Sequence, residues 1–529
     1  MKKIFSIVLF FISGGNCFAQ QITFQKMLGG TYNDYGWSVQ QTTDGGYIIG
    51  GSVTSFGVNG DVYLIKTDSF GDTLWTRTFG GTNIDYGYTV QQTSDGGYII
   101  TGRRSGSAGS YPGTYLIKTD TIGNLIWTKM YAGIQNSECF SVQQTIDGGY
   151  IITGYTNSYF GVGNDVYLIK TDANGDSLWT KSFAGPGTET GFCVHQTIDG
   201  GYIITGNTSS FGAGGSDILL IKTDTLGNLL WAKTFGGAVS DWAYSVEQTT
   251  DGGYIIAGST DNFGAGADDV YLIKTDANGD ALWSKTFGGI NDDNGWWVEQ
   301  TTDGGYIITG TTGSFGAGMI DVYLVKTDPN GNLLWTKSFG GTDDDVAYSV
   351  QQTTDGGYAI TGRTFSFAIG FDHVYFIKTD SLGNSGCNET STTTIVTAPA
   401  TQVTSPATIV TSPPTIVTTP ATIAGSGGIV TALCTTVGIS PTPALPAGEG
   451  VAITPNPTTN NFTITFPNTI NKGFIEIYNV LGKKIFKENI FNISQKEIRL
   501  KPARPLAAGI YFVKVRDGER EYCEKLVIK

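Results

Sequence analysis

The stretch Asp251-Gly-Gly-Tyr-Ile-Ile-Ala decides the fold of this chain, together with Val270-Tyr-Leu-Ile-Lys-Thr-Asp and Leu282-Trp-Ser-Lys-Thr-Phe that follow it. Runs of β-branched, aliphatic and aromatic residues are typical of strands, and the Asp-Gly-Gly and Asp-x-x-Gly sequences between them are typical of tight turns. With Tyr244-Ser-Val-Glu-Gln-Thr before them, these runs predict four short strands in one unit.

The unit occurs seven times. Asp-Gly-Gly-Tyr starts are spaced once by 51 and five times by 52 residues, and Lys-Thr-Asp recurs in step. The starts are Asp44, Asp95, Asp147, Asp199, Asp251, Asp303 and Asp355. Four strands in about 50 residues is typical of one blade of a β-propeller. We therefore predict an all-β fold whose body, residues 20–387, is a seven-bladed β-propeller.

The two ends of the repeat array predict how it closes. The fourth predicted strand carries a tryptophan in six units, and the seventh unit has Cys387 at that position. The N-terminal run Phe24-Gln-Lys-Met-Leu-Gly-Gly aligns with Trp75-Thr-Arg-Thr-Phe-Gly-Gly. We expect residues 22–28 to complete the last blade and close the ring, which would leave no sheet edge exposed between its ends.

The segment Lys274-Thr-Asp-Ala-Asn-Gly-Asp-Ala-Leu-Trp resembles the tryptophan-docking repeat of quinoprotein-type propellers. The resemblance implies that the tryptophans pack the blades together, and it implies no quinone cofactor. The adjacent-cysteine pair of many quinoprotein dehydrogenases is absent from this sequence.

Residues 1–19 have the pattern of a secretory signal peptide. Lys2 and Lys3 precede a short apolar run, and Ala19 before Gln20 suits cleavage. No later segment approaches the ~20 apolar residues of a transmembrane helix. The net charge of −14 argues against a nucleic-acid partner. We expect an exported protein.

Residues 388–450 are rich in Thr, Pro, Val and Ala, with valines seven residues apart and prolines in step. Because each cycle contains proline, we expect an extended linker and no coiled coil. Cys387 and Cys434 bracket most of this segment. They form a disulfide in one interpretation and stay unpaired in the other.

Residues 451–529 have a different β-rich composition. They contain Ile453-Thr-Pro-Asn-Pro, Ile477-Tyr-Asn-Val-Leu-Gly-Lys, Leu506-Ala-Ala-Gly-Ile-Tyr-Phe-Val-Lys-Val and Lys525-Leu-Val-Ile-Lys. This order resembles the type A C-terminal sorting domain of the type IX secretion system of Bacteroidetes, with Gly509, Tyr511 and Lys525 in its motifs. The resemblance implies a small β-sandwich, the type IX secretion machinery as partner, and a secreted or outer-surface protein whose sorting domain is commonly cleaved. An ordinary β module without a sorting role is the alternative.

Departures from the repeat are the candidate site residues. Each first strand carries an aromatic residue expected in the core, Trp296 in the sixth unit, and the next position is Ser, Thr or Cys except at Trp297. With Trp242 and Asp293, these residues would bind a sugar ring by stacking and hydrogen bonds at a channel mouth on the loop face. Packing is the alternative role of the tryptophans. The loop acids, such as Asp293, bond loop backbone in the interpretation that we favour.

Chemistry beyond binding has weaker support in the sequence. Only His195 and His373 are present, so we expect no metal site and no cofactor; calcium in the Asp-x-x-Gly turns is an alternative to simple hairpin turns. No catalytic set emerges. We expect a surface or secreted module that binds polysaccharide or a surface protein. A carbohydrate-active hydrolase or lyase and a structural matrix protein are the alternatives, and near-identical units favour binding or structure over catalysis.

Overall fold

The computed structural model describes residues 21–528, with gaps in the loops and the C-terminal third. The gaps are 57–58, 106–111, 133–135, 158–162, 369, 400–401, 405–408, 412–415, 419–422, 426–427, 438–451, 455–461, 466–469, 480–483, 494–496, 501–505, 507–508 and 518–519. The predicted signal peptide and its cleavage site between Ala19 and Gln20 lie outside the described residues. Within the described residues every regular element is a β-strand, and none is a helix able to span a membrane.

Seven five-stranded antiparallel sheets, here called repeat sheets 1 to 7, are built from the seven units. Their first strands are β2 (Asp34–Gln41), β6 (Asp85–Gln92), β10 (Ser137–Gln144), β14 (Glu189–Gln196), β18 (Asp241–Gln248), β22 (Asp293–Gln300) and β26 (Asp345–Gln352). Their second strands are β3 (Tyr47–Val53), β7 (Tyr98–Arg104), β11 (Tyr150–Thr156), β15 (Tyr202–Thr208), β19 (Tyr254–Thr260), β23 (Tyr306–Thr312) and β27 (Tyr358–Thr364).

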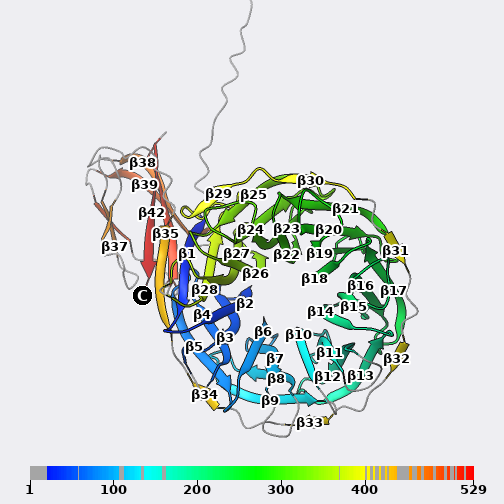
Figure 1. Cartoon of the computed structure of the whole chain (residues 1–529). Helices are drawn as coiled ribbons and strands as arrows, with labels where there is room; N and C mark the ends of the chain where they lie inside the picture. The colour runs from blue at the N-terminus through cyan, green and yellow to red at the C-terminus, as the bar shows by residue number, and fades with distance from the viewer. Residues whose placement is uncertain are drawn as a thin grey trace, which may run out of the picture. The chain divides into compact units, whose positions relative to one another are not determined.

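The third and fourth strands follow the same order. The third strands are β4 (Asp61–Thr67), β8 (Gly113–Thr119), β12 (Asp165–Thr171), β16 (Asp217–Thr223), β20 (Asp269–Thr275), β24 (Asp321–Thr327) and β28 (His373–Thr379). The fourth strands are β5 (Thr73–Gly80), β9 (Leu125–Ala132), β13 (Ser177–Ala184), β17 (Leu229–Gly236), β21 (Ala281–Gly288), β25 (Leu333–Phe339) and, in repeat sheet 7, β1 (Ile22–Gly29). Figure 1 shows the repeat sheets side by side, with their first strands innermost.

The prediction of a closed seven-bladed β-propeller is wrong. The strands form separate small antiparallel sheets, none of which closes on itself, and each repeat sheet has five strands where four were expected. The fifth strand is present because residues beyond 388, expected to be a linker, pair with the outer edge of every repeat sheet. The pairing predicted for the N-terminal run is nevertheless present, because β1 lies antiparallel to β28 with Phe24 opposite Lys378.

The fifth strands come from a segment that we call the belt, residues 389–437. They are β29 (Glu389–Ser391), β30 (Ile395–Thr397), β31 (Gln402–Thr404), β32 (Ile409–Thr411), β33 (Ile416–Thr418), β34 (Ile423–Gly425) and β35 (Ile429–Val437). Each pairs with the fourth strand of one repeat sheet. The belt thus covers part of edges that would otherwise present unpaired N–H and C=O groups.

Neighbouring repeat sheets are joined by an aromatic contact. The Trp231 ring of β17 lies 5.9 Å from the Tyr254 ring of the next sheet. It also lies beneath Gly279, which has φ +78° and whose added Cβ would come within 2.7 Å of the indole. In repeat sheet 7 Phe24 takes the tryptophan's place, against Tyr47 and Gly71.

A salt bridge connects the two recurring sequence motifs. The Lys274 ammonium, in a buried side chain, lies 2.9 Å from the Asp251 carboxylate of the Asp-Gly-Gly turn and donates to the Thr275 carbonyl. Burial alone would raise the pKa of Asp251, but donors from Thr249, Lys274 and the Gly253 N–H hold it at about 2. The same Lys–Asp pair is present in all seven units.

The C-terminal residues form a separate compact unit, which begins at Val437. One sheet has the order β36 (Ala452–Thr454), β37 (Phe462–Thr465), β40 (Glu497–Leu500). The other has the order β39 (Lys484–Ile493), β38 (Ile470–Asn479), β41 (Gly509–Asp517), β42 (Arg520–Ile528). Both contribute to one core that includes Ile464, Ile477 and Val513. Gly509 and Tyr511 lie on β41, and Lys525 lies on β42 opposite Phe512.

The salt bridge makes a testable prediction about stability. Asp251→Asn removes the charge that balances a buried ammonium, so we expect the free energy of unfolding to fall by roughly 1–3 kcal/mol, the lower part of the range for buried pairs because the carboxylate is partly exposed. Asp280→Asn is the matched control, because Asp280 pairs with the more exposed Lys233; it should cost less than about 1 kcal/mol. Urea denaturation measures both, and equal losses would contradict the account.

Candidate functional site

Each first strand contains a β-bulge, and an aromatic residue occupies it. In β22 the pairing with β23 shifts between Gly295 and Trp297, so Trp296 occupies a β-bulge. A bulge re-aims the side chains of a strand. The other repeat sheets shift at the equivalent residue.

The seven bulge residues contact one another in a closed series, here called the aromatic circle. Trp37 stacks on Tyr348 at 4.1 Å between ring centroids, and Tyr244 lies 4.3 Å from Trp296. Every other neighbouring pair is 5.1–6.0 Å apart. The full order is Trp37, Tyr88, Phe140, Phe192, Tyr244, Trp296 and Tyr348. All seven are half-buried, so they pack against one another without belonging to the fully buried core that the sequence predicted for them.

A cavity of about 280 Å³ lies next to the aromatic circle, on the side of the Asp-Gly-Gly turns. All seven first strands contribute to it, four of them with three successive residues and the others with one or two. The lining residues are Ser38, Val39, Gln40, Thr89, Val90, Gln91, Ser141, Val142, Gln143, Val194, His195, Glu247, Trp297, Val298, Glu299, Val350 and Gln351. We call this space the central cavity.

The outermost layer of the central cavity links the repeat sheets by hydrogen bonds. Gln143 Oε1 accepts the Gln196 N–H at 2.6 Å, and glutamines of other units do the same. Glu247 and Glu299 replace glutamine in two units and each uses one carboxylate oxygen in this way, toward Gln300 and Gln352. Replacing glutamine by glutamate keeps this link and adds a carboxyl group to the cavity wall.

Burial changes the protonation of the cavity's titratable groups. It raises the pKa of Glu247 to about 7, and burial together with the nearby Glu247 charge raises the pKa of Glu299 to about 8. Burial also lowers the pKa of His195 to about 4, so its imidazole is neutral at pH 7. Among the described residues of the lining none is Lys or Arg, so no cation of the protein balances the two glutamates there.

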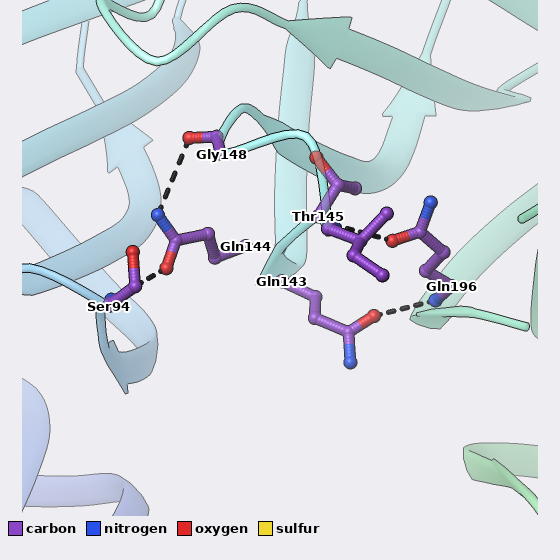
Figure 2. A pocket seen from close by; sticks show the side chains of 7 residues that line it. Ser94, Gln143, Gln144, Thr145, Gly148 and Gln196 are labelled. Atoms are coloured by element: carbon purple, nitrogen blue, oxygen red, sulfur yellow. Dashed lines mark hydrogen bonds between the residues drawn. The ribbon is translucent and has the colours of Figure 1, made fainter.

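A second, more open cavity of about 370 Å³ lies at the turn face and shares Gln143 with the first. Its lining residues are Ser94, Gln143, Gln144, Thr145, Ile146, Gly148 and Gln196. Figure 2 shows Gln144 bonded to the Gly148 carbonyl and Gln143 bonded to the Gln196 backbone. The Ile146 side chain is 94% exposed and Ile198, one unit further, is 86% exposed. The other units have Thr or Ser at this position.

The structure does not bring the four predicted ligand-binding residues together. Trp297 lines the central cavity, and Trp296 is one of the seven residues of the aromatic circle. Asp293 is buried and accepts the Gly289 N–H at 2.7 Å, the backbone bond that we favoured for the loop acids. Trp242 is half-buried and lies outside both cavity linings.

The ligand site predicted on the loop face stays a prediction. Glu247, Glu299 and Ile146, which line the two cavities, were not among the predicted site residues. The signal was available, because His195, Glu247 and Glu299 are the departures from glutamine in one column of the repeat.

The Asp-x-x-Gly turns are hairpin turns. Asp276 accepts the N–H groups of Asn278 and Asp280, each at 2.9 Å. Among the described residues no group of three His, Cys, Asp or Glu side chains is placed to hold a metal ion. The turn carboxylates thus serve the backbone, as the hairpin interpretation predicts.

The C-terminal unit matches a known family. Residues 452–529 match the secretion system C-terminal sorting domain. Export by the type IX system, to the outer cell surface or the medium, follows from this match. The sorting domain also implies interaction with the type IX secretion machinery.

Similarity to curated proteins is partial. A regulatory protein, FlaEY, of Caulobacter vibrioides is 28% identical over 194 residues, which are 32% of this chain and 20% of that protein. An endo-acting ulvan lyase of Formosa agariphila is 39% identical over 80 residues, 15% of each chain. The chain thus spans at most a fifth of these relatives. The alignment to a solved structure, the BSP domain of a biofilm-associated protein, spans 98% of this chain and 99% of that chain at 9% identity, with a TM-score of 0.13.

The raised pKa values predict a pH dependence of stability. An acid whose pKa is raised on folding stabilises the fold below its unfolded pKa, near 4.5, and this contribution is lost as the pH rises through about 7 and 8. We expect the Tm of the Glu247→Gln/Glu299→Gln variant to fall less between pH 5 and pH 9 than the Tm of the wild type does, as measured by differential scanning calorimetry. Glu488→Gln, at an exposed residue, is the control and should follow the wild type. Parallel curves for all three proteins would contradict the assignment.

Proposed function

We propose that the exported chain is a binding module that takes the end of a glycan into the central cavity from the turn face. The observation that carries this proposal is the position of Trp297, the one tryptophan in a column of small residues, in the wall of that cavity. Export by type IX secretion supports a role outside the cell, where polysaccharides are available as ligands.

The asymmetry of the cavity supports a site there. Residues that repeat in every unit hold the sheets together, as the Lys–Asp pairs and the tryptophans do. The departures in the cavity lining lie in consecutive units: His195 in the fourth, Glu247 in the fifth, and Glu299 with Trp297 in the sixth. Ile146, in the third unit, lines the second cavity. A scaffold would need none of them, because the other units pack with Gln, Ser or Thr at the same positions.

The chemistry of the lining suits a sugar. Carboxamide and carboxyl groups pair with adjacent hydroxyl groups, and an indole offers an apolar face to the C–H groups of a pyranose. The volume of about 280 Å³ is at the lower end of ligand sites, which favours one terminal sugar unit over a whole chain. At pH 7 Glu299 is largely protonated and donates a hydrogen bond to a ligand oxygen.

A carbohydrate-active lyase or hydrolase is the second candidate. Glu247 and Glu299 occupy neighbouring units and have pKa values of about 7 and 8, the range in which a carboxyl group acts as general acid or base. The ulvan lyase among the relatives fits this alternative, but it shares only 80 residues with this chain. A structural matrix protein, the third alternative, would need no cavity residues at all.

Binding to a glycan array tests the proposal. We expect saturable binding without release of oligosaccharide, and at least tenfold weaker binding by Trp297→Ser, which installs the residue that four other units carry. Trp242→Ala is the control, because Trp242 lies outside the cavity and its loss should leave affinity unchanged. Released oligosaccharide would show that the protein is a lyase or hydrolase and would overturn the proposal of a binding module. Loss of binding in Trp242→Ala but not in Trp297→Ser would overturn the site.

A further inference from the structure

The belt strands pair with the repeat sheets in an order opposite to the order of those sheets in the chain. β29 pairs with β25 of repeat sheet 6, and β30 to β34 follow on sheets 5, 4, 3, 2 and 1. β35 then pairs with β1 of repeat sheet 7. Figure 1 shows these strands on the outer side of the ring of sheets. One segment therefore touches all seven repeat sheets in a single circuit.

The seven-residue period of the belt matches the spacing of the sheets. The middle residues of β30 to β33 lie opposite the same position in successive fourth strands. These pairs are Val396 with Phe287, Val403 with Phe235, Val410 with Phe183 and Val417 with Tyr131. Each seven-residue cycle therefore supplies one short strand to one repeat sheet.

The last belt strand pairs with the strand that comes from the other end of the repeat array. β1 reaches its neighbour β28 from the other end of the chain, whereas short turns join the other fourth strands to their third strands. β35 lies on the outer side of β1 and has nine residues, while β29 to β34 have three each. The longest belt strand therefore pairs with the one fourth strand that no short turn joins to its third strand.

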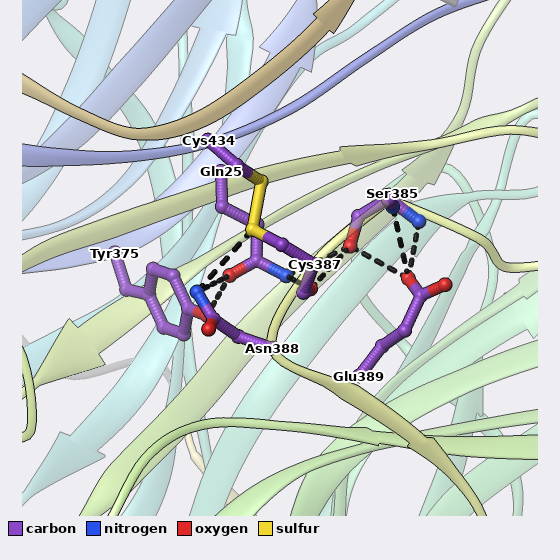
Figure 3. Close-up of a disulfide and its surroundings, with 8 residues drawn as sticks. Gln25, Tyr375, Ser385, Cys387, Asn388, Glu389 and Cys434 are labelled. Atoms are coloured by element: carbon purple, nitrogen blue, oxygen red, sulfur yellow. Dashed lines mark hydrogen bonds between the residues drawn. A yellow bond between two sulfur atoms is a disulfide. The ribbon is translucent and has the colours of Figure 1, made fainter.

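A disulfide joins the two ends of the belt beside this junction. Cys387 and Cys434 are bonded across a sequence separation of 47, with their Cα atoms 6.4 Å apart. Gln25 of β1 donates to Ser385 Oγ at 2.7 Å and to the Cys387 carbonyl, and it accepts from Asn388 (Figure 3). The first turn before the belt is thus bonded to the N-terminal strand.

We propose that the belt strands β29 to β35, closed by the Cys387–Cys434 disulfide, act as a redox-sensitive strap that holds the N-terminal strand in place. With the disulfide closed, β1 leaves its sheet only if β35 moves, and β35 is tethered to both ends of the circuit. With the disulfide open, strand pairing alone holds the belt, and its ends separate from β1 first.

Closing the strap is an ordinary thiol–disulfide exchange. The Cys387 or Cys434 thiolate attacks a disulfide oxidant and forms a mixed disulfide with release of one thiol. The second cysteine, after losing its proton, attacks the mixed disulfide and releases the other thiol. Two cysteine thiols are oxidised and one oxidant disulfide is reduced. The exported location provides the oxidising environment in which such bonds persist.

Hydrogen exchange of the full chain with and without dithiothreitol tests the proposal. We expect reduction to speed exchange at least tenfold in peptides covering residues 22–29 and 429–437, with little change in β15 and β19. The Cys387→Ser/Cys434→Ser variant should show the fast exchange without reductant and a Tm lower by roughly 5 °C or more. Reductant should not affect this variant, which controls for the other cysteines.

Two results would overturn the strap. One is free thiols at Cys387 and Cys434 in protein collected from the medium or cell surface, shown by alkylation and mass spectrometry. The other is unchanged exchange in residues 22–29 after full reduction of the folded wild-type protein. The second measurement needs no substitution, so a variant that fails to fold does not prevent a decision.

Discussion

The contact between the tryptophan of one repeat sheet and the tyrosine and glycine of the next is the interaction on which the arrangement of the repeat sheets depends. It is made again at each junction, with Phe24 in place of tryptophan at the seventh. Burying one such ring is worth roughly 4–6 kcal/mol as an upper estimate. The glycine must have a positive φ and no side chain, and the tyrosine follows the Asp-Gly-Gly turn. Most of the identical residues of the repeat therefore serve this junction or the Lys–Asp pair beside it.

This use of the repeated residues limits where function can lie. A position that recurs in most units has the same partner there, as the loop acids of five units show when they accept a backbone N–H group. The central cavity is different, because its wall needs only side chains that link neighbouring first strands. Glutamine, glutamate and histidine are all accepted there. The protein can consequently change the chemistry of the cavity without changing the fold.

The sequence predicted the strands, the turns and the partner of the N-terminal strand, because alternation, turn residues and the missing seventh tryptophan are local or count-based signals. It did not predict the fifth strands. A three-residue strand such as Ile395–Thr397 in a proline-rich segment has no pattern of its own, and its pairing depends on an edge already formed elsewhere. The central cavity was not predicted for a related reason. The bulge at Trp296 changes which neighbouring residues face inward, and neither spacing nor composition shows a bulge.

The central claim is that departures from the repeat, gathered in the central cavity, form the binding site. A crystal structure of the protein soaked with an oligosaccharide selected on the array tests this most directly. The account predicts a sugar ring against Trp297, with hydroxyl groups bonded to Glu299 and the glutamines of the neighbouring units. A ligand bound at the loop face beside Trp242 and Asp293, with the central cavity empty, would contradict it.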